Sequence, residues 1–280
     1  MLARPTLMFS LALAFLTASG NAGPLVYVVT FNGQFGAPTP GEFGSIEPTT
    51  GVYNQIGPSI ADPLGGLVVG PNGYIGVTFS GNLDSINPAT GAITVIGATG
   101  LGNLALDTAE VNGTVYETDL NQNLYTINPA TGAATIVGST GIDPAPTDPA
   151  DLFDEALFSV GGNLYATWDS FNATTLALID DPELYQINTS TGVATEVGPT
   201  ARQIDAAIEL NGIVYAFTAT NTPQVLSLDL ATGDTSVVTN YDPAAFFIDG
   251  AAATPEPAPF ALAGIGVAAI LVSRLRRRRS

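Results

Sequence analysis

One short segment occurs five times along the chain, and this repeat sets the strongest limit on the fold. Two copies are nearly identical, SINPATGAITVIG from Ser85 and TINPATGAATIVG from Thr126. Each copy has an alternating apolar run, a polar turn ending in Thr-Gly and a second β-rich run, which predicts strand, turn and strand. The turn glycines are Gly51, Gly91, Gly132, Gly192 and Gly233, at spacings of 40, 41, 60 and 41 residues. A period near 40 is typical of propeller blades, and the long third interval predicts an insertion.

A second repeated hairpin lies between successive copies of the first. Its runs begin at Leu67, Thr108, Leu157 and Ala207, and its turns are Asn72-Gly73, Asn112-Gly113, Gly162-Asn163 and Asn211-Gly212. Such pairs suit the positive φ angles of tight hairpins. Two hairpins per repeat give four strands, the content of one blade. The sequence therefore predicts an all-β fold, a five-bladed β-propeller, with an open solenoid as the main alternative.

The first blade lacks one strand in the linear sequence. The body opens directly on LVYVVTF from Leu25, which aligns with the second strands of the other blades. One β-like segment remains unassigned, FFIDGA at residues 246–251, and it resembles a first strand. We expect it to pair beside residues 25–31 and close the ring, because closure removes an edge that would be open to aggregation.

One column of the repeat is aromatic. It contains Tyr27, Tyr116, Tyr165 and Tyr215, with Ile75 in the remaining blade. Because a plain aliphatic side chain is accepted there, core packing is the preferred interpretation. The Asn-Pro-Ala-Thr-Gly sequence is likewise interpreted as turn chemistry and not as an active site.

The N-terminal end, residues 1–22, has the pattern of a secretory signal peptide. Arg4 precedes an apolar run at residues 7–16, and the small residues Gly20 and Ala22 follow. This order predicts cleavage after Ala22 and export of the body, residues 23–253. A buried first helix is the alternative.

The C-terminal end, residues 254–280, has three parts. Pro255, Glu256 and Pro257 precede a thirteen-residue apolar stretch at 260–272, and the arginines Arg276, Arg277, Arg278 and Arg279 follow. A membrane-spanning helix needs ~20 residues, so this helix would be short for a bilayer. The arginines would stay in the cytoplasm, which would place the body outside.

This tail, together with the signal peptide, resembles the PEP-CTERM sorting signal of Gram-negative bacteria that make extracellular polysaccharide. The same type of tail is also labelled an ice-binding-protein C-terminal domain, a name that implies no ice binding. The resemblance covers only the last 27 residues. It implies an exosortase, a membrane enzyme, as the processing partner, acting near Pro255, Glu256 and Pro257. An ordinary tail anchor that is never cleaved is the alternative.

Composition excludes several functions. Of the 25 acidic residues only Glu256 lies outside the body, where Arg202 is the single basic residue. This charge repels nucleic acids and anionic lipid headgroups. The chain has neither His nor Cys, which excludes disulfides, thiolate nucleophiles, histidine bases and ordinary zinc sites. Any chemistry must use carboxylates, hydroxyls or a hard cation.

Two irregular segments, 139–155 and 168–183, are predicted to be loops on one face beside the fourth blade. Loops on a rigid scaffold commonly carry function. The candidate ligand-binding residues are Trp168, Asp169, Asp151, Asp154, Glu155, Asp180, Asp181 and Glu183, with Asp143 and Asp148 nearby. These acids suggest a calcium site, against the alternative of a solvated acidic rim. Trp168 is interpreted either as a stacking platform for a sugar ring or as a core residue.

These features predict an exported protein, located at the cell surface or in the extracellular matrix, with a non-enzymatic binding or structural propeller. Its expected partners are a polysaccharide or an envelope protein, and no organic cofactor is predicted. The alternative is a glycoside hydrolase, since two carboxyl groups ~5 to 9 Å apart suffice for that reaction. No acid lies in a recognisable catalytic motif.

Overall fold

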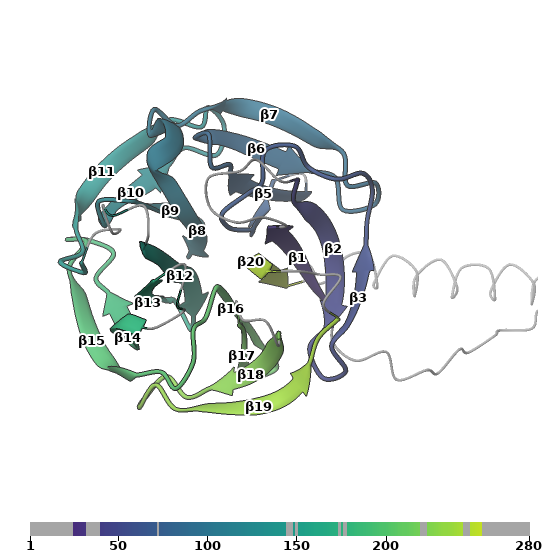
Figure 1. Cartoon of the computed structure of the whole chain (residues 1–280). Helices are drawn as coiled ribbons and strands as arrows, with labels where there is room; N and C mark the ends of the chain where they lie inside the picture. Colours follow the sequence, from purple (N-terminus) through teal and green to yellow (C-terminus); the bar gives the residue numbers. More distant parts are fainter. Residues whose placement is uncertain are drawn as a thin grey trace, which may run out of the picture.

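The strands of the chain form a closed ring. The computed structural model describes residues 25–31, 40–71, 73–143, 148, 151–172, 175, 178–218, 223–242 and 247–253. The predicted signal peptide, 1–22, and sorting tail, 254–280, lie outside these residues, as do Ala22, Pro255 to Pro257 and Arg276 to Arg279. The described residues form five four-stranded antiparallel sheets around one axis (Figure 1). The prediction of a five-bladed β-propeller is confirmed.

Each blade has four strands, ordered below from the centre of the ring outward. Blade 1 comprises β20 (Phe247–Ala253), β1 (Val26–Phe31), β2 (Glu42–Glu47) and β3 (Val52–Gln55). Blade 2 comprises β4 (Val68–Gly70), β5 (Gly73–Val77), β6 (Asn82–Ile86) and β7 (Ile93–Ala98). Blade 3 follows a 3-10 helix, η1 (Gly102–Leu104), and comprises β8 (Ala105–Val111), β9 (Thr114–Asp119), β10 (Asn123–Ile127) and β11 (Ala134–Ser139). Blade 4 comprises β12 (Asp151–Val160), β13 (Asn163–Asn172), β14 (Leu178–Ile187) and β15 (Ala194–Pro199). Blade 5 comprises β16 (Ala206–Leu210), β17 (Ile213–Phe217), β18 (Gln224–Leu228) and β19 (Thr235–Asn240).

The ring closes through the last strand of the body. β20 pairs antiparallel with β1, with Tyr27 opposite Ala252 and Thr30 opposite Ile248. The Tyr74 hydroxyl of blade 2 also donates a hydrogen bond to the Ala253 carbonyl oxygen at 3.1 Å. The predicted closing strand is therefore confirmed, although it starts at Phe247 and continues to Ala253. The first and last strands of the ring stabilise one blade together.

The repeated Thr-Gly turn joins neighbouring blades as well as bending its own strand. Gly132 has a φ of 82°, and a Cβ placed on it would lie 2.5 Å from the Gly97 carbonyl oxygen of blade 2. The turn glycines and their contacts are Gly51 on Asn240, Gly91 on Ile56, Gly132 on Gly97, Gly192 on Gly138 and Gly233 on Pro199. A side chain at these positions would push two backbones apart, which explains why the turn recurs with so little change.

The hydrophobic core is divided among the spaces between blades. Five clusters of buried side chains fill the five blade-to-blade interfaces. Tyr116, Tyr165, Tyr215 and Ile75 are all buried there, so the interpretation of their column as core packing is confirmed. Tyr27 is half-buried and stacks on Phe43 with ring centroids 5.5 Å apart.

Blade 4 differs from the prediction. β12, β13 and β14 each have ten residues, so much of the two segments predicted as loops is strand. Asp151 pairs with Asn172 and Trp168 pairs with Glu183, at the end of the blade away from the Val160–Asn163 turn. Asp and Pro favoured a loop assignment, but cross-strand pairing overrides that local preference.

Candidate functional site

An acidic residue recurs where the innermost strands begin. The corresponding pairs are Leu106-Asp107, Asp154-Glu155, Ile204-Asp205 and Ile248-Asp249, with Leu64-Gly65 in blade 2. Sequence reasoning missed Asp107, Asp205 and Asp249. The signal that could have found them is an acid that recurs a few residues upstream of the first hairpin turn of the blade in three blades, and near the start of the closing strand in a fourth.

Three of the buried acids are surrounded by hydrogen-bond donors, and we call them the donor-paired group: Asp107, Glu117 and Glu155. At a shift in the β8–β9 register, the Leu106 N–H donates to Glu117 Oε1 at 3.0 Å. The Thr108 hydroxyl donates to Glu117 Oε2 at 2.5 Å. The backbone N–H groups of Thr108 and Leu157 donate to the two oxygens of Asp107 at 2.6 and 2.5 Å. These carboxyl groups therefore accept hydrogen bonds from backbone groups where the strand pairing is irregular.

Glu155 links blade 4 to blade 3. The Thr118 hydroxyl and the Gln122 amide each donate to one oxygen of Glu155 at 2.5 Å. Burial raises the pKa of Glu155 to about 7, although these hydrogen bonds act in the opposite direction. Burial also raises the pKa values of Asp107 and Glu117 well above the usual range. The donor-paired group has a structural explanation, because each member accepts hydrogen bonds from neighbouring groups.

Four other acids converge from three blades, and we call them the four-aspartate group: Asp154 and Asp169 of blade 4, Asp205 before β16, and Asp249 of β20. The carboxyl groups of Asp154 and Asp205 lie in hydrogen-bonding contact. Asp249 lies at the irregular point of the β1–β20 pairing. Asp169 Oδ1 accepts a hydrogen bond from Gln203 Nε2 at 3.1 Å. The group joins positions that lie up to 95 residues apart in the sequence.

Two oxygens of the four-aspartate group are buried without a hydrogen-bond donor. They are Oδ2 of Asp154 and Oδ2 of Asp249. Asp154 and Asp205 are 6% and 7% exposed, whereas Asp249 is half-buried as a residue. A buried carboxylate without a donor or a counter-charge is unfavourable. Oδ1 of Asp84, outside the group, is also buried without a donor, so this property alone does not mark the group.

The electrostatic surroundings of the four aspartates are negative. Burial, followed by the neighbouring aspartates, raises the pKa values of Asp154, Asp205 and Asp249 well above the usual range. Burial raises the pKa of Asp169 to about 7. Arg202, the only basic residue between positions 25 and 253, is exposed. The body therefore supplies no second basic residue that could neutralise the group.

A small cavity lies among the five innermost strands and is lined in part by Asp249. Its volume is about 170 Å³. Much of its lining is small, and includes Ala109, Ala206, Ala207, Ala251 and Ala252. The acids in the lining are Asp107, Glu110 and Asp249. Asp249 thus belongs both to the cavity wall and to the four-aspartate group.

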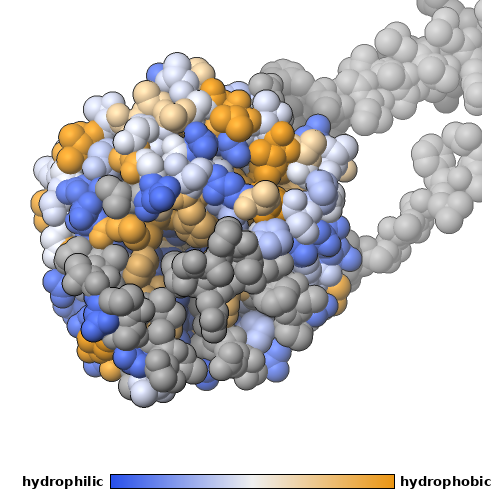
Figure 2. Space-filling model, turned by 45° about the horizontal axis from the view of Figure 1, so that its top comes forward, coloured by the Kyte–Doolittle hydropathy of each residue, from blue (hydrophilic) through white to orange (hydrophobic). Residues whose placement is uncertain are grey.

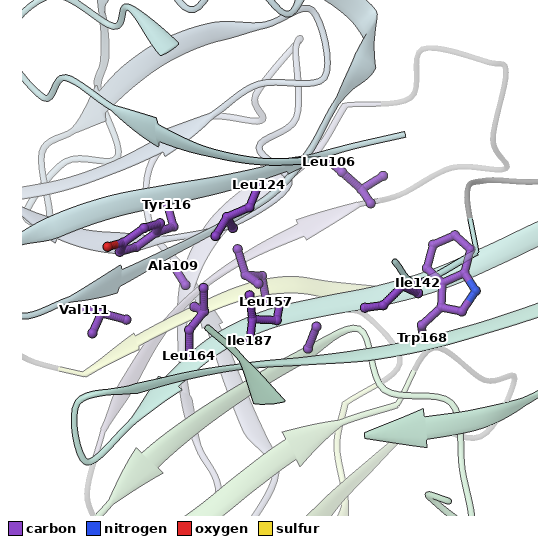
Figure 3. Packing of buried hydrophobic residues seen from close by; sticks show 11 residues of the cluster. Leu106, Ala109, Val111, Tyr116, Leu124, Ile142, Leu157, Leu164, Trp168 and Ile187 are labelled. Atoms are coloured by element: carbon purple, nitrogen blue, oxygen red, sulfur yellow. The ribbon is translucent and has the colours of Figure 1, made fainter. Parts of the chain in front are cut away.

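Of the two interpretations of Trp168, a stacking platform or a core residue, the structure supports the core residue. Its side chain is 4% exposed and stacks on Phe153, with ring centroids 5.1 Å apart. Figure 3 shows it beside Ile142, at one side of the apolar cluster between blades 3 and 4. The alternation of β13 turns this residue into the blade interface, where burial of a large aromatic ring is favourable.

The other candidate acids differ in how far they are exposed. Asp154, Glu155 and Asp169 are buried and contact residues of other elements. Asp143, Asp148, Asp180 and Asp181 are exposed. Glu183 is half-buried and accepts a hydrogen bond from the Tyr185 hydroxyl at 2.5 Å. Asp151 lies in β12, and its side chain is outside the described set. The eight candidates therefore do not form one exposed site.

Metal binding remains a prediction from residue chemistry. Within the described part of the chain, no three acidic side chains already surround a common point as metal ligands. Carboxylate oxygens are nevertheless the ligands that Ca²⁺ prefers. Any ion at the four-aspartate group would require side-chain rotation.

Exposed apolar side chains are scattered around the ring. Figure 2 shows them on the visible face as separate groups among polar residues. On the outer strands, Val95, Ile136 and Val237 are 61%, 60% and 50% exposed. On β14, Leu178 and Ile179 are 48% and 52% exposed and directly precede the exposed Asp180 and Asp181. In the described ranges, no helix is long and apolar enough to span a bilayer.

No protein-family model matches the chain, and a search of curated proteins finds no match. Among solved structures, the chain is similar to a protein of Bacteroides fragilis whose assignment as a 6-phosphogluconolactonase is itself a proposal. The identity is 12%, the TM-score is 0.42, and the match covers 84% of this chain and 98% of that one. It is also similar to glutaminyl cyclase of Myxococcus xanthus, with 18% identity, a TM-score of 0.34, and coverage of 68% and 70%. A third similar structure is the computationally designed protein Ika4, with 12% identity, a TM-score of 0.35, and coverage of 59% and 91%.

Proposed function

We propose that the chain is an exported propeller that acts as a non-enzymatic binding module for exopolysaccharide at the cell surface or in the extracellular matrix. The observation that carries this proposal is the asymmetry of the ring. Three strands of blade 4 have ten residues each, whereas the described strands of the other blades have three to seven. Blade 4 therefore extends on the face away from the short hairpin turns, where a ligand can be contacted without disturbing the ring.

The edge of this extension has side chains suited to a sugar chain. Leu178 and Ile179 are about half exposed, and the carboxylates of Asp180 and Asp181 follow them directly on β14. Sugar rings present C–H groups that pack on apolar side chains and hydroxyl groups that donate to carboxylates. The apolar-acid sequence on one strand therefore matches the two kinds of surface of a polysaccharide.

The proposed location rests on the two ends of the sequence. The signal peptide would export the body, and the PEP-CTERM-like tail would hold it in the membrane until an exosortase acts near Pro255 to Pro257. The arginines Arg276 to Arg279 would remain in the cytoplasm. The acidic body does not suit an anionic membrane surface or a nucleic acid.

Hydrolysis of the polysaccharide is less well supported than binding. A glycoside hydrolase needs two carboxyl groups on either side of a bound sugar. The clustered acids Asp154, Asp169 and Asp205 are at most 7% exposed, so a sugar could reach them only after rearrangement of the blades. Binding at an exposed edge requires no such change.

The test is co-sedimentation of the full-length chain, purified in detergent, with the exopolysaccharide of the producing organism. We expect saturable binding that weakens in a variant with Leu178→Ser and Ile179→Ser. The matched control carries Val95→Ser and Ile136→Ser, which remove somewhat more exposed apolar side chains from the outer strands. Absence of binding, or equal loss in both variants, would contradict the proposal, and release of reducing ends would favour the hydrolase.

A further inference from the structure

We propose that Asn112 is a site of self-modification, at which the side-chain amide is lost and an aspartate or an isoaspartate is formed. The reaction uses only groups of this chain and water, and the inference is independent of the polysaccharide proposal. Asn112 and Gly113 form the tight turn between β8 and β9 in blade 3. The nucleophile is the backbone nitrogen of Gly113, and the carboxylate of Glu110 is its base.

The first argument is the position of the Glu110 carboxylate. The backbone N–H of Gly113 donates a hydrogen bond to Oε1 of Glu110. A backbone nitrogen is a weak nucleophile while it holds its proton, and a base in contact with that proton raises its reactivity. The carboxylate therefore contacts the group that must lose a proton before it can attack the Asn112 side chain.

The second argument is the freedom of the Asn112 side chain. Asn112 is exposed, and in the part of the chain that the structure describes no hydrogen bond holds its side-chain amide. A Cβ placed on Gly113 would meet no atom within 4 Å, so the space around the attacking nitrogen is open. The amide carbon of Asn112 can therefore rotate toward the Gly113 nitrogen without breaking another contact.

The third argument is a second turn that lacks the contact. In blade 5, Asn211 and Gly212 have φ angles of 55° and 79°, close to the 51° and 83° of Asn112 and Gly113. Glu209 precedes Asn211 at the same spacing, but among the described residues it accepts no hydrogen bond from the Gly212 N–H. The two turns share residue types and backbone conformation and differ in the position of the carboxylate. Asn112 is therefore the asparagine that should react faster.

The bonds of the reaction balance with water as the only added reagent. Glu110 takes the proton of the Gly113 N–H, and the Gly113 nitrogen forms a bond to Cγ of Asn112. The bond between Cγ and Nδ2 breaks, and Nδ2 leaves as ammonia with the proton that Glu110 returns. Water then opens the cyclic imide at either carbonyl carbon, which gives an aspartate or an isoaspartate at this position.

The modification changes the contact between two hairpin turns. A Cβ placed on Gly162 of blade 4 would lie 3.4 Å from Nδ2 of Asn112, so the amide lies beside the neighbouring turn. Loss of the amide adds a negative charge there, and an isoaspartate also lengthens the backbone of a turn whose geometry is narrowly defined. The surface formed by the turns of blades 3 and 4 therefore changes with the age of the protein.

The test is incubation of the full-length chain, purified in detergent, at neutral pH, followed by chymotryptic digestion and mass spectrometry. Chymotrypsin cuts after Leu and Tyr, which places Asn112 and Asn211 in separate peptides. We expect Asn112 to lose its amide at least about tenfold faster than Asn211, because a positioned base contributes at least this factor. In urea, where Glu110 is no longer positioned, the two rates should become similar.

Equal rates in the folded chain would overturn the proposal. A difference that persists in urea would also overturn it, because the neighbouring sequence and not the folded turn would then set the rate. This comparison uses the unaltered chain, so it decides the question even if a variant fails to fold.

Matched variants identify the base. Glu110→Gln keeps an acceptor oxygen for the Gly113 N–H but removes the base, so it should slow loss of the Asn112 amide by about tenfold or more. Glu209→Gln removes the corresponding acid of blade 5 and should leave the rate at Asn112 unchanged. An unchanged rate in Glu110→Gln, or equal slowing by both substitutions, would contradict the role of Glu110.

Discussion

The two buried acid groups of this propeller are adjacent in sequence only at Asp154 and Glu155, and they have opposite surroundings. Both occur where an innermost strand departs from regular pairing, at the β8–β9 shift for Asp107 and at the β1–β20 shift for Asp249. In the donor-paired group, hydrogen bonds from backbone or side-chain donors reach every acid. In the four-aspartate group, two oxygens receive none.

This difference separates acids that are matched by hydrogen-bond donors from acids whose neighbours are other carboxyl groups. A carboxyl group that satisfies a displaced backbone N–H replaces a missing hydrogen bond of the sheet, and its loss exposes that N–H. A carboxyl group whose neighbours are other carboxyl groups adds repulsion to the folded ring unless a proton or a cation neutralises it. Removal of one acid from each group should therefore change stability in opposite directions.

The largest effect is expected for Glu117→Ala in the donor-paired group. The substitution leaves the Leu106 N–H and the Thr108 hydroxyl without their acceptor, and should lower the free energy of unfolding by about 4 kcal/mol. Urea denaturation of the full-length chain measures this change. Glu117→Gln retains one acceptor oxygen and should lose only about half as much. A decrease in unfolding free energy below about 1 kcal/mol for Glu117→Ala would show that the donor-paired group does not stabilise the fold.

A smaller effect is expected from pH. Burial, followed by the charge of Asp62, raises the pKa of Asp84 to about 6. Burial also raises the pKa values of Asp107 and Glu117, which face Glu155, Asp119 and each other across blades 3 and 4. Because the folded state binds these protons more tightly than the unfolded state, their contribution is complete below about pH 4 and is lost as pH rises through the folded pKa values.

Asp84 alone should therefore lower the unfolding free energy of the chelator-treated chain by about 2 kcal/mol between pH 4 and pH 8. Urea denaturation at each pH measures the slope, and Asp84→Asn should reduce the slope near pH 6. Stability that rises over this range would show that the buried acids are ionised and favourably paired in the folded chain.

Asp205→Asn tests the difference between the two acid groups most directly, although its expected effect on stability is smaller than the effect of pH. In chelator the substitution removes one charge from the four-aspartate group and gives Asp154 a donor, so stability at pH 8 should rise by about 1 to 2 kcal/mol. If the calcium ion that the sequence suggests were bound at these aspartates, the order would reverse in saturating Ca²⁺, because only the unaltered chain would gain the full binding energy. Thermal melts of both proteins in both conditions measure the reversal. An increase in stability that is equal in Ca²⁺ and in chelator would show that protons alone neutralise the four-aspartate group.

Much of the fold could be predicted because its signals are local. The Thr-Gly turns, the second hairpins and the alternation of apolar residues lie within short segments, so they predicted five blades and the closing strand. The contacts of Gly132 with blade 2 could not be predicted, because turn chemistry alone accounts for a glycine at that position. The long strands of blade 4 were missed for a related reason, since Asp and Pro favour loops locally and only pairing across strands overrides them.

The candidate site could be predicted only in part. Asp154, Glu155 and Asp169 were among the candidates because they lie in an irregular segment, but their partners Asp205 and Asp249 lie in other blades. Trp168 aligns with polar residues at the ends of the second strands of other blades, such as Thr30 and Thr218, so the sequence left an exposed and a buried position both open. The side of a strand that faces a neighbouring blade is fixed by register, and here the register turns Trp168 inward.

The smallest effect is expected for Asp181→Asn, and it tests whether burial, rather than acidity itself, separates the two acid groups from the rest of the chain. Asp181 is exposed on β14, so its charge is screened by solvent and salt. Its replacement should change the free energy of unfolding by less than about 0.5 kcal/mol, in chelator and in Ca²⁺ alike. Urea denaturation in both conditions provides the measurement. A change above about 1 kcal/mol that appears only with Ca²⁺ would mean that the exposed edge of blade 4 holds a cation, and burial would then not be what gives an acid of this ring its effect on stability.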